Sequence, residues 1–268
     1  MKNHILTALL FLMGSVCFAQ DEQPVSGQIA GHDYVDLGLP SGTLWATYNV
    51  GATKPTEYGG YFAWGETEPK EEYNFRTYKW CKGSYDSMTK YCTESGFGFV
   101  DKKTVLDPED DAATANWGGS WRMPTKNEII ELIDGCTWEW IENFQGSGVN
   151  GCLGNSKLNG ASIFLPAAGN RNGTDFEKDG KYGYYWSSSL DKLYPDDAYN
   201  LYFSNDGKLH YKAYYRHYGY NVRAVSIKEY TVSFYTKDSV LIESQKVKKG
   251  KSATAVDAPI VDGYEFIG

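Results

Sequence analysis

Four acidic residues stand in the segment Asp107–Asp111, which reads DPEDD. Carboxylate oxygens on a loop are ligands that Ca²⁺ prefers, so Asp107, Glu109 and Asp110 are candidate ligands of a calcium ion. The adjacent pair Asp196-Asp197 is a second candidate, although neither segment has the spacing of an EF-hand. Two carboxylates about 5–10 Å apart could alternatively cleave a glycosidic bond, whereas a short acidic run is often plain solvated surface. Calcium is therefore the one ion that the sequence suggests, and it suggests no other cofactor.

Residues for nucleophilic catalysis are present but lack an arrangement that would make them reactive. Ser187–Ser189 follow a tryptophan, no G-x-S-x-G segment occurs, and the histidines after the first twenty residues are His32, His210 and His217. A serine nucleophile needs a base within hydrogen-bond reach and a group that orients this base. We expect these serines to bond to buried backbone groups instead, and we expect the protein not to be an enzyme.

Four cysteines follow the first twenty residues, at Cys81, Cys92, Cys136 and Cys152. An even number in an exported protein allows disulfides, and sequence proximity favours Cys81–Cys92 and Cys136–Cys152 among the three connectivities. Each bond would close a loop of about 10–17 residues and stabilise the fold by about 3 kcal/mol. Four buried free thiols are the alternative. A zinc site is not indicated, because no CxxC pair occurs.

Tyrosines crowd the segment from residue 194 to residue 220. Exposed rings and arginines are favoured in binding interfaces, and rings stack on sugars as well as on proteins. The residues that we predict to bind a ligand are Arg171, Tyr194, Tyr214, Arg216 and Tyr218. Packing in the core and across strands is the alternative for these rings. The predicted partner is a glycan or a surface protein.

The composition argues against nucleic acid as a partner. The 268 residues carry a net charge of −8, and no basic run supplies the clustered phosphate contacts that nucleic-acid binding requires. Aromatic residues make up 16% of the chain, which suits half-exposed sheets because a tyrosine buries its ring while its hydroxyl stays polar. The length suffices for one large core or for a core with an appendage.

The N-terminal residues have the pattern of a signal peptide over residues 1–19. Lys2 supplies the positive charge, Ile5–Met13 the apolar run, and Ala19 a small residue for cleavage. The apolar run is too short for a membrane-spanning helix, and no later stretch is apolar enough for one. We expect an exported protein whose residues 20–30 form a short polar leader.

The elements that must position these residues are short. Periodicity and turn residues predict strands at Asp33–Leu37, Thr43–Val50 and Tyr58–Gly65. The segment Glu66–Asp111 has little periodicity and reads as one long excursion. A helix is predicted at Thr125–Asp134. Its N-cap is Thr125, the capping box is completed by Glu128, and Gly135 stops it.

Short strands follow, separated by Gly and Asn turns. The predicted strands are Gly151–Lys157, Ala161–Pro166, Tyr182–Ser188, Ala198–Phe203, Leu209–Tyr215 and Tyr220–Ile227. Asn159-Gly160 predicts a two-residue hairpin loop between the first two strands. Asp206-Gly207 predicts that Leu209–Tyr215 pairs antiparallel with the strand before it.

Six motifs carry a family resemblance. They are GHDYVDLGLPSGTLWATYNVGA (Gly31–Ala52), YFAWGET (Tyr61–Thr67), DPEDDAATANWGGSWRMPT (Asp107–Thr125), NGASIFLPAAGNR (Asn159–Arg171), GYYWSSS (Gly183–Ser189) and NVRAV (Asn221–Val225). In this order they resemble the Fibrobacter succinogenes major paralogous domain of exported proteins in Bacteroides-type Gram-negative bacteria. The resemblance covers residues 31–227. It implies a loop-rich fold similar to C-type lectins and the formylglycine-generating enzyme, in the periplasm, on the outer surface or secreted. It implies no established activity.

Two known chemistries of that fold do not transfer to this chain. The late cysteine pair that holds copper in the formylglycine-generating enzyme is missing, since no cysteine follows Cys152. The Glu-Pro-Asn, Gln-Pro-Asp and Trp-Asn-Asp triplets of sugar-binding C-type lectins are also absent. The resemblance therefore implies a scaffold and leaves its ligand open.

The composition changes at Lys228, after which apolar and polar residues alternate. The last segment, Pro259–Gly268, resembles the start of a Listeria–Bacteroides repeat, a small β-grasp-like module of adhesins. Residues 228–268 are therefore predicted to form a small, incomplete β unit.

Together these patterns predict an α+β fold with short antiparallel strands and few helices. The predicted function is a non-catalytic binding module. The alternatives are an adhesin component that assembles through its C-terminal repeat, and an enzyme of unknown class.

Overall fold

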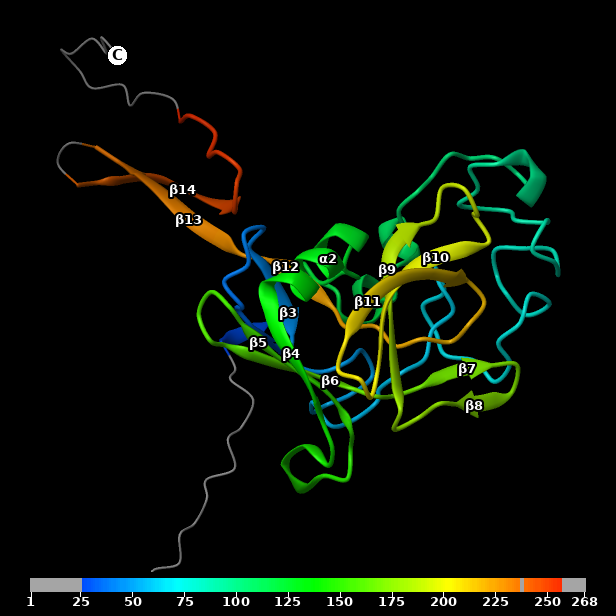
Figure 1. Ribbon diagram of the computed structural model, residues 1–268. Coiled ribbons are helices and arrows are strands. Elements are labelled where there is room, and N and C mark those ends of the chain that lie inside the picture. Colours follow the sequence, from blue (N-terminus) through cyan, green and yellow to red (C-terminus); the bar gives the residue numbers. More distant parts are fainter. Residues whose placement is uncertain (1–25, 237–238, 257–268) are drawn as a thin grey trace, which may run out of the picture.

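Antiparallel strands provide most of the regular structure in the computed structural model, which describes residues 26–236 and 239–256. The predicted signal peptide and the Pro259–Gly268 motif lie outside the described residues. The fold is β-rich and loop-rich, with two α-helices among the described residues (Figure 1). Neither helix has the length and apolar character needed to cross a membrane. The β-rich fold with these two short helices agrees with the predicted α+β class at the coarse level.

The first sheet joins the two ends of the region 31–227. Its strand order is β1-β2-β3-β12, and all pairs are antiparallel. The bounds are β1 Gly27–Ile29, β2 His32–Val35, β3 Thr43–Ala46 and β12 Val225–Ile227. Trp45 pairs with Val225, so the first and the last motif are neighbours. Strand β1 lies within the predicted polar leader, where no strand was expected.

Two further sheets and a short hairpin complete the main body. One sheet is β4 (Cys136–Ile141), β5 (Gly151–Ser156) and β6 (Ser162–Pro166); the other is β9 (Tyr182–Leu190), β10 (Asp197–Ser204) and β11 (Leu209–Tyr215); the hairpin is β7 (Asn170–Asn172) and β8 (Asp175–Glu177). Strand β11 has the predicted bounds and pairs antiparallel with β10, as Asp206-Gly207 predicted. The loop at Asn159-Gly160 is longer than predicted, because Ser156 N donates to Ala161 O across it.

Helix α2 (Lys126–Gly135) begins where its capping box predicts. Thr125 accepts a bond from Glu128 N, and the Glu128 carboxylate accepts one from Thr125 N. Gly135 does not stop the helix in a left-handed conformation; it is the last helical residue, and a Cβ there would lie 2.5 Å from Leu39 Cδ2. Gly135 is therefore explained by close packing against Leu39. The remaining helical segments are α1 (Ala112–Trp117) and the 3₁₀ turns η1 (Ser95–Phe97), η2 (Pro108–Asp110) and η3 (Phe144–Gly146).

Buried tryptophans tie the motifs to one another. Trp64 Nε1 donates to Ser187 O at 2.7 Å, and Trp186 Nε1 donates to Phe62 O at 2.8 Å. Trp121 Nε1 donates to Ile29 O at 2.8 Å. A buried indole N–H without a partner would destabilise the fold, so each of these bonds fixes the mutual position of two chain segments that are distant in sequence.

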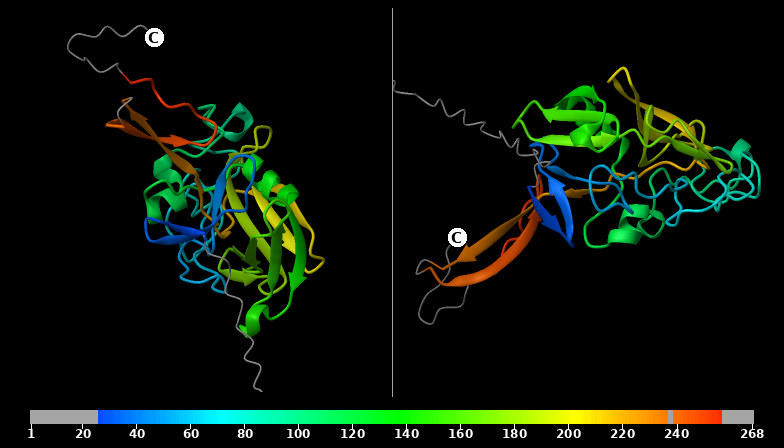
Figure 2. Two further views of the ribbon diagram at one scale, coloured as in Figure 1. Left: turned by 90° about the vertical axis from the view of Figure 1, so that its left-hand side faces the viewer. Right: turned by 90° about the horizontal axis from the view of Figure 1, so that it is seen from below.

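The excursion Glu66–Asp111 is irregular, as predicted. Its backbone contains η1, η2 and isolated bridges such as Cys81 with Met88. The expected strand Tyr58–Gly65 is not formed, because only Phe62 pairs, in a single bridge with Tyr220. Figures 1 and 2 show the excursion at the end of the molecule opposite to the C-terminal strands.

The C-terminal strands form a two-stranded hairpin of β13 (Glu229–Tyr235) and β14 (Leu241–Lys248). It projects from the main body in both Figure 1 and Figure 2. Two hydrogen bonds hold its base against the main body. Lys228 Nζ donates to Asp36 Oδ2 at 2.7 Å, and Lys249 Nζ donates to Leu39 O at 3.1 Å. The hairpin is thus an appendage joined to the main body at one end.

Candidate functional site

Two adjoining cavities lie between the N-terminus of α2, the segment around Val105 and the end of β9. The first has a volume of about 500 Å³ and the second one of about 550 Å³. Both are lined by Val105 and Thr125. We call the two together the groove. Each volume falls in the range of about 300–1,000 Å³ that is common for ligand sites.

The first cavity combines rings with polar groups. Tyr194 and Tyr199 line it together with Lys126, Asn127 and Lys192. Tyr194 is 60% exposed. The Lys126 ammonium lies 3.7 Å from the centre of the Tyr199 ring and 5.1 Å from that of Tyr211, and these cation–π contacts fix its position.

A network around Glu128 sets the position of the α2 N-terminus. The carboxylate accepts bonds from Arg122 at 2.5 and 2.7 Å and from Thr43 Oγ1 at 3.1 Å. Burial alone would raise the pKa of Glu128, but the bonds and charge of Arg122 outweigh burial and hold that pKa below its ordinary value. Lys126 N donates to Ser189 Oγ at 3.0 Å. These bonds therefore fix the N-terminus of α2 against the end of β9.

The opposite wall of the first cavity is a tight turn after β9. Asp191 Oδ1 accepts bonds from Leu193 N at 2.9 Å and from Tyr194 N at 3.3 Å. Lys192 O accepts one from Thr93 Oγ1 of the excursion at 2.7 Å. Tyr194 thus stands on a turn whose backbone is fixed from both sides.

The second cavity is lined by hydroxyls and a guanidinium. Thr114, Ser120, Arg122 and Ser188 are among its lining residues. Thr114 Oγ1 donates to Trp121 O at 3.0 Å, and the hydroxyls of Ser120 and Ser226 lie 2.6 Å apart. Ser120 and Trp121 belong to the segment that connects α1 to α2, and these bonds hold that segment against α1 and β12.

The five predicted ligand residues do not gather at one site. Tyr194 lines the groove, whereas Arg171 on β7 lies with its guanidinium 5.6 Å from the ring of Phe176. Tyr214 and Tyr218 are half-buried in a tyrosine cluster around Tyr184 and Tyr220. For these two rings the structure agrees with the packing alternative.

The prediction of Arg216 as a ligand residue is wrong, since its side chain is fully buried. Its guanidinium donates to Tyr78 Oη, Tyr91 O, Pro195 O and Lys90 O at 2.7–3.1 Å. It also lies 4.9 Å from the ring of Trp64. Arg216 therefore holds the excursion against the main body.

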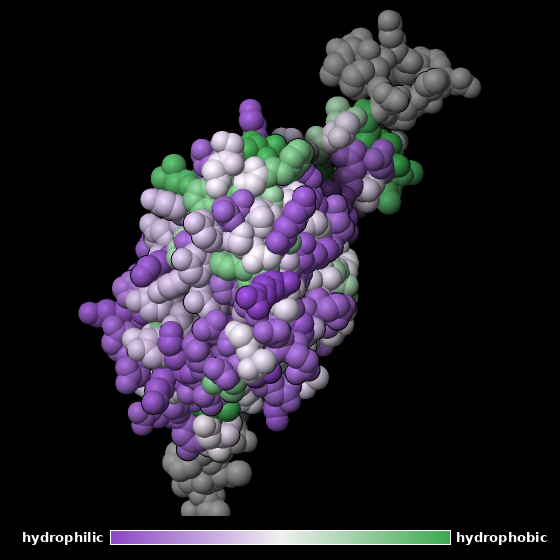
Figure 3. Space-filling view, turned by 90° about the vertical axis from the view of Figure 1, so that its right-hand side faces the viewer, coloured by the Kyte–Doolittle hydropathy of each residue, from purple (hydrophilic) through white to green (hydrophobic). Residues whose placement is uncertain are grey.

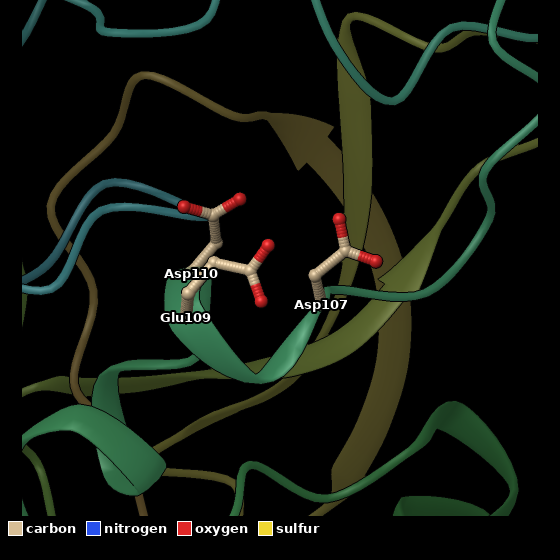
Figure 4. A group of neighbouring side chains, drawn as sticks. All are labelled: Asp107, Glu109 and Asp110. Atoms are coloured by element: carbon tan, nitrogen blue, oxygen red, sulfur yellow. The ribbon is translucent and has the colours of Figure 1, made fainter.

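The predicted calcium ligands Asp107, Glu109 and Asp110 do come together (Figure 4), with ligand atoms within 4.8 Å of one another. Lys90 Nζ lies 2.7 Å from Asp107, 2.6 Å from Asp110 and 3.8 Å from Glu109. Hydrogen bonds from Lys103 and Lys90 lower the pKa of Asp107 to about 2. The protein's own ammonium occupies the position where a cation would bind, so calcium would have to displace Lys90.

The predicted disulfides are not formed; all four thiols are free. Cys136 pairs with Ser156 and Cys152 with Trp140, so the two cysteines are offset by the four positions from 152 to 156. At about 3.4 Å per residue this offset is about 14 Å, well beyond the roughly 7 Å between Cα atoms that a disulfide can bridge. Burial raises the pKa of these thiols to about 11 and about 12, which makes them unreactive.

The Cys81–Cys92 pairing is also not formed. Cys81 Sγ donates to Phe75 O at 2.9 Å, and Cys92 Sγ donates to Glu94 O at 3.2 Å. Cys92 is fully buried in a small cluster with Tyr73, Tyr78 and Met88, against which Cys81 packs. Both thiols act as small core residues of the excursion.

The serines behave as predicted. Ser187 Oγ donates to Tyr199 O at 2.7 Å, and Ser189 Oγ accepts from Lys126 N. His217 is buried between Phe75 and Tyr218, and burial lowers its pKa to about 4. The nearest ring to His32 is Trp117, stacked at 3.9 Å. None of these contacts joins a serine to a histidine.

Asp197 is a half-buried acid that the sequence indicates only as part of an acidic pair. Burial, followed by the charges of Asp196 and Asp191, raises the pKa of Asp197 to about 7. Its Oδ1 atom is buried without a hydrogen-bond partner. Sequence reasoning also missed Lys126 and Asn127 as groove residues. The available signal was their place directly after the N-cap, where side chains flank a free helix end.

Comparisons with known proteins give no further assignment: no family model, no curated protein and no solved structure matches this chain.

Proposed function

We propose that this protein is a non-catalytic module that binds glycans in the groove, outside the cytoplasm. The observation that carries the proposal is the first cavity, which is lined by Tyr194 and Tyr199 together with the polar residues Lys126, Asn127 and Lys192. Sugar rings offer apolar faces that stack on aromatic rings and hydroxyls that pair with polar side chains. The groove supplies both kinds of contact on a fixed backbone.

The face that carries the excursion is mostly polar, which favours a glycan over a hydrophobic protein as the partner. Figure 3 looks at the side that carries the excursion, and that face is largely hydrophilic with small, separate hydrophobic spots. A stable protein interface has a more continuous apolar centre. The export signal and the resemblance to the Fibrobacter succinogenes major paralogous domain support a place outside the cytoplasm.

The carboxylates among the described lining residues of the groove are not arranged for catalysis, which supports binding without bond cleavage. Its described lining includes two carboxylates. Asp191 is engaged by backbone N–H groups, and Asp111 caps α1 through Thr114 N at 2.9 Å and also accepts from Met123 N. A glycosidase needs one carboxyl to donate a proton and another to attack or activate water, and both of these are committed to backbone bonds.

A glycan array with the purified protein tests the proposal. Wild type should bind at least one class of polysaccharide, and Tyr194→Ala should weaken this binding about tenfold or more, since stacking on one ring contributes about 1–3 kcal/mol elsewhere. The matched control is Tyr235→Ala, because Tyr235 is 58% exposed on the distant hairpin. Failure of wild type to bind any member of a broad array would refute the proposal.

Assembly through the hairpin is a second candidate function. Tyr235, Val240 and Leu241 are exposed near its tip, and an isolated two-stranded sheet offers two open edges. If assembly is the function, size-exclusion chromatography should show multimers without any glycan. A Val240→Glu variant should then elute as a monomer, whereas Tyr194→Ala should still assemble.

A further inference from the structure

The two cavities of the groove meet at Val105. Leu106 N donates to Ser188 O at 3.1 Å, and Leu190 N donates to Thr104 O at 2.9 Å. These bonds flank the bridge between Val105 and Ser189. The backbone at the junction is thus fixed on both sides, so the relative position of the two cavities is fixed as well.

The Val105 side chain stands at the junction without filling it. It is 47% exposed and lines both cavities. Thr125 also lines both cavities, and the capping box fixes its backbone. A ligand that lies over Val105 would contact both cavities at the same time.

The two cavities differ in what they offer. The first has the rings of Tyr194 and Tyr199 with the ammonium of Lys126. The second is lined by Thr114, Ser120, Ser188 and Arg122, which carry hydroxyls and a guanidinium, and by the apolar Pro108. Each is large enough for a ligand on its own, so a single sugar would leave half of the groove unused.

We infer that the ligand is a glycan chain of several sugar units, with one subsite on each side of Val105. This inference rests on the proposed function. The chain runs from the rings at Tyr194 across Val105 to the hydroxyls at Ser120. Neither cavity is enclosed, so the site can take an internal segment of a polysaccharide and does not require a chain end.

Calorimetric titration with oligosaccharides of one to six units tests the inference. The probes are released from the polysaccharides that bind on the array. Affinity should rise at least tenfold as the chain grows long enough to cross Val105, and then level off. An affinity that is the same for one unit and for six would overturn the inference while leaving the proposed function intact. If nothing on the array binds, both fail.

A substitution at the junction provides a second, independent test. Val105→Trp should block the passage and reduce the affinity for the six-unit chain to that for the short ones, while short-chain binding changes less than threefold. The matched control is Val240→Trp, at a 62% exposed position on the hairpin, which should bind like wild type. Full six-unit affinity in a folded Val105→Trp protein would overturn the inference. The wild-type length series remains decisive if this variant does not fold.

Discussion

Two arginines carry positive charge into the core without a carboxylate at ion-pair distance among the described residues. Arg216 and Arg223 are buried, and neither takes part in an ion pair within residues 26–236 and 239–256. Neutral oxygens take the place of carboxylates: Arg223 donates to the backbone carbonyls of Ala46 and Thr47 and to the side-chain Oδ1 of Asn49. Burial lowers the pKa of Arg223 to about 10. Charge buried in this way requires an accurately placed backbone, so both arginines depend on the loops that they hold.

Lys90 stabilises the excursion through the acidic cluster at η2. Lys90→Met keeps the length of the side chain but leaves Asp110, which is almost fully buried, with one ammonium partner, Lys79 at 3.2 Å. Removal of one partner from a buried pair is strongly destabilising. We expect a loss of about 3 kcal/mol in the free energy of unfolding, measured by chemical denaturation at pH 7. Lys102→Met, at an exposed position in the same excursion, is the control and should cost less than about 0.5 kcal/mol. Equal stability of both variants would contradict the role given to Lys90.

Asp197 destabilises the folded protein as the pH rises. Its pKa is raised from an ordinary value of 3.8 to about 7, so between these values the folded state holds a proton that the unfolded state has lost. The contribution of Asp197 to the free energy of unfolding is therefore fully present below about pH 4 and is lost as the pH rises towards 7. Asp197→Asn cannot titrate, and it should gain roughly 4 kcal/mol on wild type between pH 4 and pH 8. Denaturation curves at both pH values measure this gain.

Asp206→Asn is the matched control for this experiment. A hydrogen bond from Lys208 N, followed by one from Ser204, lowers the pKa of Asp206 in its exposed turn. The stabilising contribution of this group is present above its ordinary pKa and is lost as the pH falls. Between pH 4 and pH 8 this contribution is already nearly complete, so the control should gain nothing on wild type over that range. If Asp206→Asn gains as much as Asp197→Asn, the raised pKa assigned to Asp197 is wrong.

At the scale of elements, α2 depends on Glu128 more than on its intrinsic helix propensity. Glu128 caps the helix and binds Arg122 and Thr43. Glu128→Gln removes the charge that holds Arg122, and we expect a loss of about 3 kcal/mol at pH 7. The loss should shrink below about pH 4.5, the ordinary pKa of this group, because the wild-type advantage disappears as Glu128 becomes protonated. Glu139→Gln, at an exposed position on β4, should leave stability unchanged in the same denaturation series.

Local patterns predicted the elements whose determinants are local. The capping box at Thr125 and the turn at Asp206-Gly207 need only neighbouring residues, and both predictions are confirmed. The expected strand Tyr58–Gly65 failed because pairing depends on a distant partner, and that partner supplies only Tyr220. The role of Gly135 also depends on a distant residue, because the glycine allows close packing against Leu39. Cysteine proximity in sequence likewise carried no information about strand register.

At the scale of the whole molecule, the site could be predicted only in fragments. Tyr194 was identified from composition, but Val105, Lys126 and Ser120 carry no sequence signal of a shared function. They meet because three segments far apart in the chain converge on the end of β9. Buried contacts between distant residues, such as that of Trp64 with Ser187, bring these segments together. No local sequence pattern predicts such contacts.

The projecting hairpin should be dispensable for the groove. A chain that ends after Lys228 keeps the bonds of Lys228 to Asp36 and Gly42 but loses those of Lys249 and the buried side chain of Val247. If this costs about 1 kcal/mol, the melting temperature should fall by only about 2–4 °C. Glycan affinity should stay within a factor of two of wild type, because the groove lining ends at Tyr199 and Ser188 and includes no hairpin residue. Calorimetry and titration on the shortened chain measure both quantities. A shortened chain that unfolds, or that folds but loses glycan affinity, would mean that the hairpin is part of the binding unit and not an independent appendage.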